Sequence, residues 1–247
     1  LDPKWTGTQL IPLFAIGHDL CEPAWNGFLQ DTQVPGPRLF SLLKRDFLRV
    51  FESMSLWDWD DTRNKLLQFL IVACLWRRED KAYVSLAQAR KALRVVDDSS
   101  RSHALWFLAE LIERPGTWTK FARAFLQRAW PRESKYQTPN VARQLAFLAE
   151  RAGEDFPDVV KTILPLIVPT GQLDLTVHLM SERSETSPSL ARRFPESMLQ
   201  LLDRLVPDDP RPTPYDLGGV LNLMAEASPS LRGDQRWRRL KRIADRG

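Results

Sequence analysis

Two pairs of similar segments in the C-terminal half of the chain lie at nearly the same separation. Phe156-Pro157-Asp158 and Phe194-Pro195-Glu196 each open a segment that ends in Val-Pro, and these two segments are offset by 38 residues. Ser187-Pro188-Ser189-Leu190 and Ser228-Pro229-Ser230-Leu231 are offset by 41 residues. Repeats of about 40 residues with two helices each are typical of stacked helix pairs, because each pair leaves an apolar face that only its neighbour can cover.

Composition and periodicity favour helices along the whole chain. The 247 residues include 37 leucines, but only 20 valines and isoleucines together, and β-branched residues lose more rotamer freedom in a helix than leucine does. No stretch alternates apolar and polar residues long enough to predict a strand. The spacing of apolar residues and prolines predicts two short helices within 8–30, parted near Gly17 and Pro23, and further helices over 38–54, 62–78, 85–96, 101–113, 116–130, 138–152, 156–168, 172–183, 193–206, 215–227 and 233–245.

We therefore expect an all-α fold in two parts. Residues 138–247 are predicted to form HEAT- or armadillo-like stacked helix pairs, an α-solenoid. Residues 1–137 are predicted to form an irregular helical part that packs continuously on the rest. A chance likeness between two Phe-Pro helix starts is the alternative explanation of the repeat.

The sequence does not suggest a membrane protein or a secreted protein. The longest apolar run, residues 66–76, has 11 residues, whereas a membrane-spanning helix needs about 20. Two cysteines, Cys21 and Cys74, are too few for a disulfide framework. The chain opens at Leu1 without an initiator methionine or a signal peptide. We expect a segment of a longer cytoplasmic protein that does not contact a membrane.

Side chains that commonly carry out chemistry are few and scattered. The three histidines, His18, His103 and His178, fall on separate predicted helices or turns and lack the spacing of a zinc site. The chain has no phosphate-binding glycine loop and no nucleophile elbow. We therefore expect no catalytic residue, no metal site and no cofactor.

Two alternatives to that expectation remain. Asp58, Asp60 and Asp61 could bind a divalent cation or act as an acid–base pair in a hydrolase or nuclease. Carboxylates just before a long helix also cap its free N–H groups, which is the structural interpretation. His18 could act as a base oriented by Asp19, or it could cap a turn at the surface.

Most of the basic character of the chain lies at its C-terminal end. Residues 232–247 contain seven basic and two acidic residues, so they carry +5, and the other residues together carry about −1 of the formal net charge of +4. Arginine beside tryptophan is a common anchor of protein interfaces. The sequence therefore predicts a partner-binding site on the last helix, at Arg236, Trp237, Arg239 and Arg242. Alternatively, this helix only closes the last repeat, and its basic side chains are hydrated at the surface.

Several stretches, in order across nearly the whole chain, resemble one known group of proteins. They are Ile11-Pro12-Leu13-Phe14, residues 22–29, Leu43-Lys44-Arg45-Asp46-Phe47-Leu48, Ala129-Trp130-Pro131-Arg132, residues 152–158, Arg193-Phe194-Pro195-Glu196, Leu201-Leu202-Asp203 and residues 229–240. Together they resemble the all-helical C-terminal region of large bacterial SIR2-family (sirtuin-like) proteins, which are linked to anti-phage defence.

This resemblance implies that the chain is a non-enzymatic sensor or scaffold region in the bacterial cytoplasm. A linked SIR2-like domain would bind and cleave NAD, and the helical region would recognise a phage trigger protein, restrain the enzyme or assemble an oligomer. The chain contains neither the Gly-Ala-Gly-Ile opening nor the catalytic-histidine segment of a sirtuin. No functional residue of that family can therefore be assigned here. The alternative is a helical nucleic-acid-binding module that uses the basic C-terminal helix.

Overall fold

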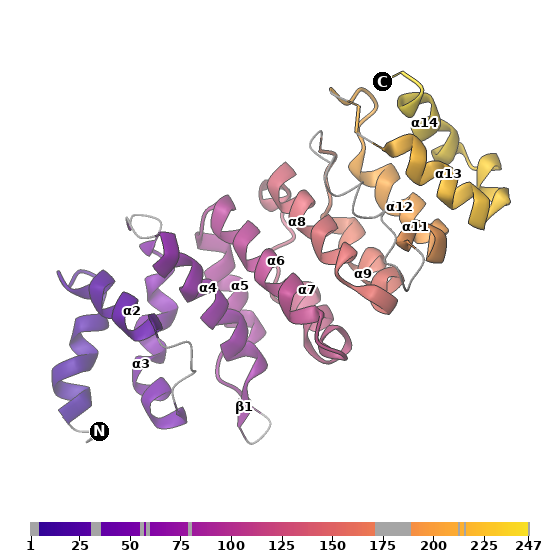
Figure 1. Cartoon of the computed structure of the whole chain (residues 1–247). Coiled ribbons are helices and arrows are strands. Elements are labelled where there is room, and N and C mark those ends of the chain that lie inside the picture. Colours follow the sequence, from indigo (N-terminus) through magenta and orange to yellow (C-terminus); the bar gives the residue numbers. More distant parts are fainter. Residues whose placement is uncertain are drawn as a thin grey trace. The chain divides into compact units, whose positions relative to one another are not determined.

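The protein folds almost entirely into helices, as the computed structural model in Figure 1 shows. The structure describes residues 5–30, 36–54, 57, 60–78, 81–170, 189–211, 213–214 and 216–246. The all-α fold class is confirmed for this part of the chain, where the strands β1 (Arg77–Arg78) and β2 (Lys81–Ala82) form a single short antiparallel pair. The predicted helix over 172–183 lies outside the described residues.

The chain divides into two compact units. Unit 1 comprises Leu1–Ala104 and Gln127–Pro131, and unit 2 comprises Leu105–Leu126 and Arg132–Gly247. The division lies earlier than the expected boundary at 137/138. A hydrogen bond from the Trp118 indole to Asp158 joins the segment before residue 138 to the repeat.

In its described residues, unit 1 contains short helical turns followed by longer helices. A π-helical turn η1 (Thr6–Leu10) leads into a 3-10 turn η2 (Ile11–Phe14), and the helices are α2 (Cys21–Gln30), α3 (Pro37–Val50), α4 (Asp60–Leu75) and α5 (Leu86–Val95). Helix α4 packs against α2 and α5, and α3 packs against η2 and α5. The expected parting of two helices near Gly17 is confirmed, because η2 ends at Phe14 and α2 begins at Cys21. Pro23 does not extend the break, since it lies in the first turn of α2, where a helical N–H has no partner within the helix.

The core of unit 1 is a cluster of aromatic rings. Phe47 lies at its centre, fully buried, with ring centroids 5.1–5.9 Å from those of four other aromatic residues. Edge-to-face geometry predominates, as expected for rings whose edges and faces carry opposite partial charge. We call this group the aromatic cluster; its members are Phe14, Trp25, Phe28, Phe40, Phe47, Phe51, Phe69 and Tyr83.

Helix α6 (Asp98–Ile112) begins in unit 1 and ends in unit 2. The chain continues with η4 (Trp118–Ala122) and α7 (Arg123–Arg128), whose last two residues belong to unit 1. Unit 2 then contains η5 (Ser134–Tyr136), α8 (Pro139–Glu150), η6 (Gly153–Asp155), α9 (Phe156–Ile163) and η7 (Leu164–Leu166). After the residues that are not described come α11 (Leu190–Arg193), α12 (Pro195–Leu205), α13 (Leu217–Ala227), η8 (Pro229–Gly233) and α14 (Gln235–Ala244).

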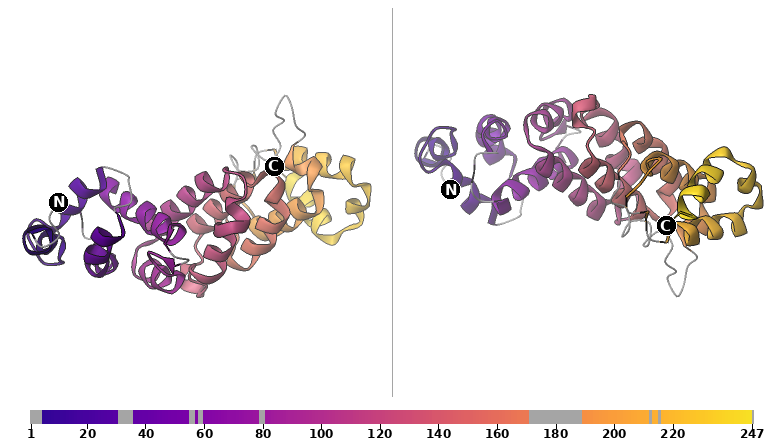
Figure 2. Two further views of the ribbon diagram at one scale, coloured as in Figure 1. Left: turned by 90° about the horizontal axis from the view of Figure 1, so that it is seen from below. Right: turned by 90° about the horizontal axis from the view of Figure 1, so that it is seen from above.

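The helices of unit 2 pack in pairs, and equivalent helices of successive pairs also touch. Helix α8 packs against α9, α11 against α12, and α13 against α14, whose yellow ribbons lie side by side in both views of Figure 2. The second helices form a row, because α9 contacts α12 and α12 contacts α14. The first helices α11 and α13 also contact each other.

The two Phe-Pro segments of the 38-residue repeat begin equivalent helices, α9 and α12. Pro157 and Pro195 lie in the first turn of these helices, where a missing N–H costs least. The rings of Phe156 and Phe194 stack on each other, with centroids 5.8 Å apart and planes inclined by 23°. The residues that the repeat aligns in sequence are therefore in direct contact.

Local capping signals set several helix boundaries. Ser85 caps α5 in a reciprocal box: its hydroxyl accepts from the Gln88 N–H, and the Gln88 side chain accepts from the Ser85 N–H. Thr138 caps α8 through the Val141 N–H. None of the helices in the described part of the chain is long and apolar enough to cross a membrane.

Candidate functional site

The predicted partner-binding residues lie on α14, the last helix of unit 2. Its start is set by Asp234, whose carboxylate accepts from the Arg236 backbone N–H at 2.8 Å. Leu240 and Ile243 are buried, and they lie three residues apart on the side of α14 that faces the unit. This packing divides the basic side chains of α14 into those that point toward the unit and those that point to solvent.

Arg236 is held by the residue that caps its own helix. Its Nη2 lies 2.7 Å from Asp234 Oδ2, and its Nε donates to Asp234 Oδ1 at 3.1 Å. The Arg236 side chain and backbone N–H together hold the pKa of Asp234 below its usual value, because both donate to the charged carboxylate. Arg236 therefore stabilises the beginning of α14.

Arg239 joins α14 to the end of α12. Its Nε donates to Asp203 Oδ1 at 3.0 Å, and its Nη2 donates to the Asp203 carbonyl at 2.8 Å. Its Nη1 donates to the Val206 carbonyl at 3.1 Å and to Asp208 Oδ1 at 2.8 Å. Carbonyls at the end of a helix have no partner within the helix, so Arg239 supplies the donors that the end of α12 lacks.

Trp237 also contacts the interior of unit 2. Its side chain is half-buried, and its indole N–H donates to the Leu221 carbonyl of α13 at 3.4 Å. The indole thus fixes α14 against α13. Three of the four predicted binding residues, Arg236, Trp237 and Arg239, are therefore engaged within the unit, and only Arg242 projects into solvent.

Arg242 was predicted, but it belongs to a group of exposed arginines that the sequence analysis did not recognise as a group. Arg238 and Arg242 lie four residues apart on α14, which places them on one side of the helix, and Arg246 lies in the turn just after its end. Arg238 Nε donates to the Arg232 carbonyl at 3.3 Å, which brings Arg232 beside them. We call Arg232, Arg238, Arg242 and Arg246 the arginine row.

The arginine row lacks the acidic partners that hold Arg236 and Arg239. All four side chains are exposed. Among the residues that the structure describes, none of the four guanidinium groups lies within ion-pair distance of a carboxylate. The four-residue spacing was a signal in the sequence. The ion pair of Arg239 was not, because its partner Asp203 lies 36 residues away in the sequence.

A shallow depression lies beside Arg246. It has a volume of about 260 Å³ and is lined by Asp208, Asp209, Pro210, Arg211, Thr213, Ile243 and Arg246. Arg211 Nη2 lies 2.9 Å from Asp209 Oδ2, so charges of both signs line the depression.

The alternative catalytic residues have structural contacts where they are described. Asp60 and Asp61 lie in the first turn of α4 and pair with Arg63 and Lys65 of the same helix. Asp58 lies outside the described residues. Within the described ranges, no group of three or more histidine, cysteine, aspartate or glutamate residues is placed to hold a metal ion.

His18 and His103 are also explained by local structure. His18 Nδ1 accepts from the Leu20 backbone N–H at 3.0 Å, so the ring caps a turn instead of facing Asp19. His103 Nε2 lies 3.1 Å from Gln68 Nε2, within hydrogen-bond distance. Burial lowers its pKa, although Asp61 opposes this effect, and the ring is therefore neutral at physiological pH. His178 lies outside the described residues.

The two cysteines are buried and free. Burial raises the pKa of the Cys74 thiol to about 12 and also raises the pKa of Cys21. A thiol needs to ionise before it acts as a nucleophile. Neither cysteine is suited to that role.

Comparison with known proteins gives one informative match. The chain is 28% identical over 167 residues to "Uncharacterized protein y4cA" of Sinorhizobium fredii (strain NBRC 101917 / NGR234). The matched stretch covers 65% of this chain but only 14% of that protein, so the chain spans a small fraction of the relative's length. No protein-family model matches the chain, and no solved structure matches it.

Proposed function

We propose that this chain is a non-enzymatic recognition region of a bacterial anti-phage defence protein in the cytoplasm. In this proposal, unit 2 is built from HEAT-like helix pairs, and the arginine row binds an acidic surface on a partner protein. Binding controls a linked SIR2-like domain that cleaves NAD. The partner is a phage trigger protein or the effector domain itself.

The packing of unit 2 supports the HEAT-like part of the proposal. In such repeats, each helix pair covers the apolar face of its neighbour, and equivalent helices contact one another. The contacts of α12 with both α9 and α14, and of α11 with α13, follow that scheme. The stacked rings of Phe156 and Phe194 occupy the same position in two successive pairs. A row of preformed helices binds a partner with little ordering cost.

The arginine row is the observation that carries the proposal of partner binding. Four guanidinium groups that are exposed and lack carboxylate partners within the described part of the chain repel one another, and an acidic partner removes that repulsion. Arginine also binds carboxylates through two parallel hydrogen bonds. By contrast, Arg236 and Arg239 already have acidic partners inside unit 2.

The resemblance to SIR2-associated helical regions supports the link to an NAD-cleaving domain. The length of the relative agrees with it, because the matched stretch is 14% of that protein and leaves room for further domains there. A trigger controls a linked domain only if it binds differently to the active and inactive states of the protein. The arginine row provides a charged surface on which such a difference can act.

The test compares two variants that lose the same charge from different surfaces. The first replaces Arg232, Arg238 and Arg242 by glutamine, and the matched control replaces three other exposed arginines, Arg114, Arg128 and Arg132. Each protein is expressed in bacteria from its own locus, and cellular NAD is measured after infection with a panel of phages. We expect infection to deplete NAD with the wild-type and control proteins, but not with the arginine-row variant.

Each other result contradicts a different part of the proposal. Equal NAD loss with the arginine-row variant and the wild type excludes the row as the trigger-binding surface. NAD that stays constant with the wild-type protein under every phage excludes the link to an NAD-cleaving domain. Loss of the response with the control variant as well would show that net charge matters, and not the position of the row.

Nucleic acid is the second candidate partner, because the arginine row also suits phosphate groups. Binding to single strands commonly adds aromatic side chains on which bases stack, but the Trp237 indole is half-buried and bonded to Leu221. This contact favours a protein partner. A gel-shift titration with DNA and RNA at low and high salt tests the alternative. Nucleic-acid binding requires an affinity that falls steeply with salt and that is lost in the arginine-row variant.

A further inference from the structure

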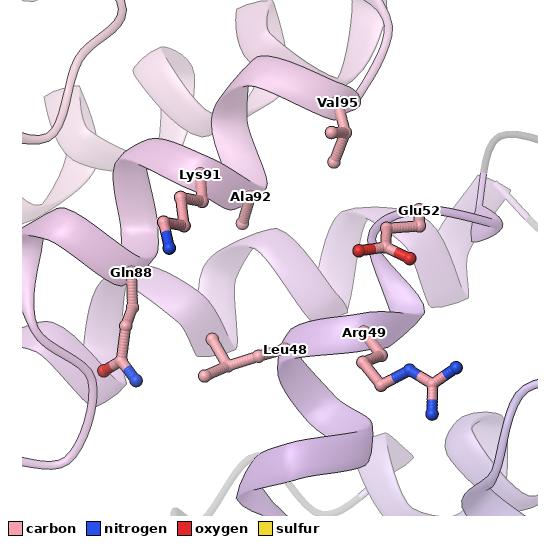
Figure 3. Close-up of a pocket in the computed structure, with 7 residues that line it drawn as sticks. All are labelled: Leu48, Arg49, Glu52, Gln88, Lys91, Ala92 and Val95. Atoms are coloured by element: carbon pink, nitrogen blue, oxygen red, sulfur yellow. The ribbon is translucent and has the colours of Figure 1, made fainter.

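A groove in unit 1 lies between α3 and α5, whereas the arginine row belongs to unit 2. It has a volume of about 290 Å³ and is lined by Leu48, Arg49, Glu52, Gln88, Lys91, Ala92 and Val95. Figure 3 shows the α5 residues along one side, while Leu48 and Glu52 extend from the other side toward the space between the helices. Arg49 projects along the outer edge of that side.

The floor of the groove is apolar and open to solvent. Leu48, Ala92 and Val95 provide aliphatic side chains, and Val95 is 52% exposed. On α5, the lining residues Gln88, Lys91, Ala92 and Val95 have the spacing i, i+3, i+4 and i+7. This spacing places them in one stripe along the helix. The stripe borders the buried side of α5, which consists of Ala89, Ala92 and Leu93, so Ala92 lies at the bottom of the groove.

The rim of the groove is basic. Arg49 and Lys91 are exposed on opposite sides of it, and Arg45 and Arg94 are exposed one turn away on the same two helices. Helix α5 contains no acidic residue. Glu52 is the one acidic residue among those that line the groove. The surroundings of the apolar floor therefore carry a net positive charge.

We propose that this groove binds an acidic amphipathic helix of a partner protein. Apolar side chains of the partner at i, i+3 or i+4, and i+7 would cover Leu48, Ala92 and Val95, which is the usual way in which a helix lies in a groove. Acidic residues on the flanks of that helix would meet Arg49 and Lys91. The proposal goes beyond the arginine row, because it concerns another surface and can fail while the row still binds its own partner.

Other occupants fit the groove less well. A second copy of this chain would bring basic helices against basic helices, which repel each other. A nucleic acid would satisfy the positive rim but would leave the aliphatic floor without an apolar partner. An acidic helix satisfies both the rim and the floor.

The experiment uses the whole chain and designed peptides as probes. The peptides have 14 residues, the length of α3, with leucine at the groove-facing positions and glutamate on the flanks. One control set carries lysine in place of glutamate, and a second contains the same residues in scrambled order. Binding is measured by fluorescence anisotropy, and the contact area is mapped by amide hydrogen exchange. We expect saturable binding of the acidic helical peptides only, with protection confined to α3 and α5.

Variants of the groove provide the second part of the test. R49E combined with K91E reverses two rim charges and is expected to weaken peptide binding about tenfold or more. V95S removes an exposed apolar contact and is expected to weaken binding severalfold. The matched control, R114E combined with R128E, reverses two exposed charges elsewhere and is expected to bind the peptides as the wild type does. Circular dichroism shows whether each variant is folded.

Four results would overturn the proposal. They are no saturable binding of any acidic peptide, equal binding of the lysine or scrambled peptides, hydrogen-exchange protection away from α3 and α5, and unchanged affinity in R49E/K91E. A concentration-dependent dimer that V95S disrupts would show instead that the groove is an interface between copies of this chain. Tight binding of single-stranded DNA that R49E/K91E abolishes would assign the groove to nucleic acid.

Discussion

Units 1 and 2 are both helical, but different interactions hold their helices together. In unit 1, the aromatic cluster connects η2, α2, α3 and α4 through ring contacts. In unit 2, polar contacts link residues that are far apart in sequence, such as Glu113 with Arg151 and Glu154 with Arg193. Helix formation alone therefore does not determine how the helices of this protein pack.

The polar contacts of unit 2 recur at a nearly constant sequence separation. Glu113 pairs with Arg151 across 38 residues, and Glu154 pairs with Arg193 across 39. Trp118 and Asp158 are 40 residues apart. Unit 1 has polar contacts of similar separation, with Thr62 and Asn26 36 residues apart and Gln68 and His103 35 apart, but its aromatic cluster shows no such period. Directional contacts specify which helices are neighbours, whereas ring burial stabilises a less regular arrangement.

The largest effect is expected at the centre of the aromatic cluster. F47A removes a fully buried ring with four aromatic neighbours and leaves a cavity, so it should lower the free energy of unfolding by about 3–5 kcal/mol. L42A, on the exposed side of α3, should cost less than about 0.5 kcal/mol. Denaturant unfolding followed by circular dichroism measures both, and hydrogen exchange should show that the loss at F47A is concentrated in unit 1. A loss below about 1 kcal/mol would mean that the cluster does not hold unit 1 together.

A matched pair of tryptophan substitutions measures the next effect. W118F removes an indole N–H that donates to the Asp158 carboxylate at 2.7 Å, and hydrogen bonds to charged groups contribute about 1.5–3 kcal/mol. W25F in unit 1 removes an N–H that donates to the neutral Phe14 carbonyl at 3.2 Å, which contributes about 0.5–1.5 kcal/mol. Both indoles are buried, so the loss of ring volume is similar. A larger loss at Trp25 would contradict the view that unit 2 depends more on charged contacts.

The cap of α14 should give a smaller effect that depends on pH. D234A removes the acceptor for the Arg236 N–H and should cost about 1 kcal/mol at pH 7, whereas D234N keeps a capping side chain and should lose only the charge. The pKa of Asp234 is lowered in the folded protein, so its charge stabilises α14 above the unfolded pKa of about 3.9 and ceases to do so as pH falls through the lower folded value.

Urea unfolding at pH 7 and near pH 3 checks this expectation. The difference between wild type and D234N should shrink as the carboxylate becomes protonated. A difference that stays constant with pH would show that the ion pair with Arg236 adds nothing to the cap.

Most of the fold could be predicted from the sequence, because the signals that end helices are local. The Ser85–Gln88 capping box and the prolines of α9 and α12 lie within a few residues of the boundaries they set. The expected helices 85–96 and 138–152 differ from α5 and α8 by only one or two residues at each end. The repeat also identified Phe156 and Phe194 as equivalent before their contact was seen.

The candidate surfaces could be predicted only in part, because they depend on distant residues. Composition indicated that the basic residues gather on the last helix, α14, but it could not separate Arg239 from Arg242. The difference arises from Asp203 on α12, which forms an ion pair with Arg239 and not with Arg242. The groove had no signal in the sequence, because Leu48 and Val95 are far apart in the chain and only the packing of α3 on α5 brings them together.

The smallest effect is expected for the surface ion pairs of unit 2. A double-mutant cycle with E113Q and R151Q should give a coupling of about 0.2–1 kcal/mol, because both side chains are partly exposed and water screens the pair. R151Q alone should cost more than this coupling, because the Arg151 guanidinium also lies over the Phe147 ring at 4.8 Å. High salt should reduce the coupling. A coupling well above 1 kcal/mol that salt leaves unchanged would mean that these pairs hold unit 2 together as the aromatic cluster holds unit 1. A small coupling would mean that the pairs select which helices are neighbours, while buried apolar side chains supply most of the stability in both units.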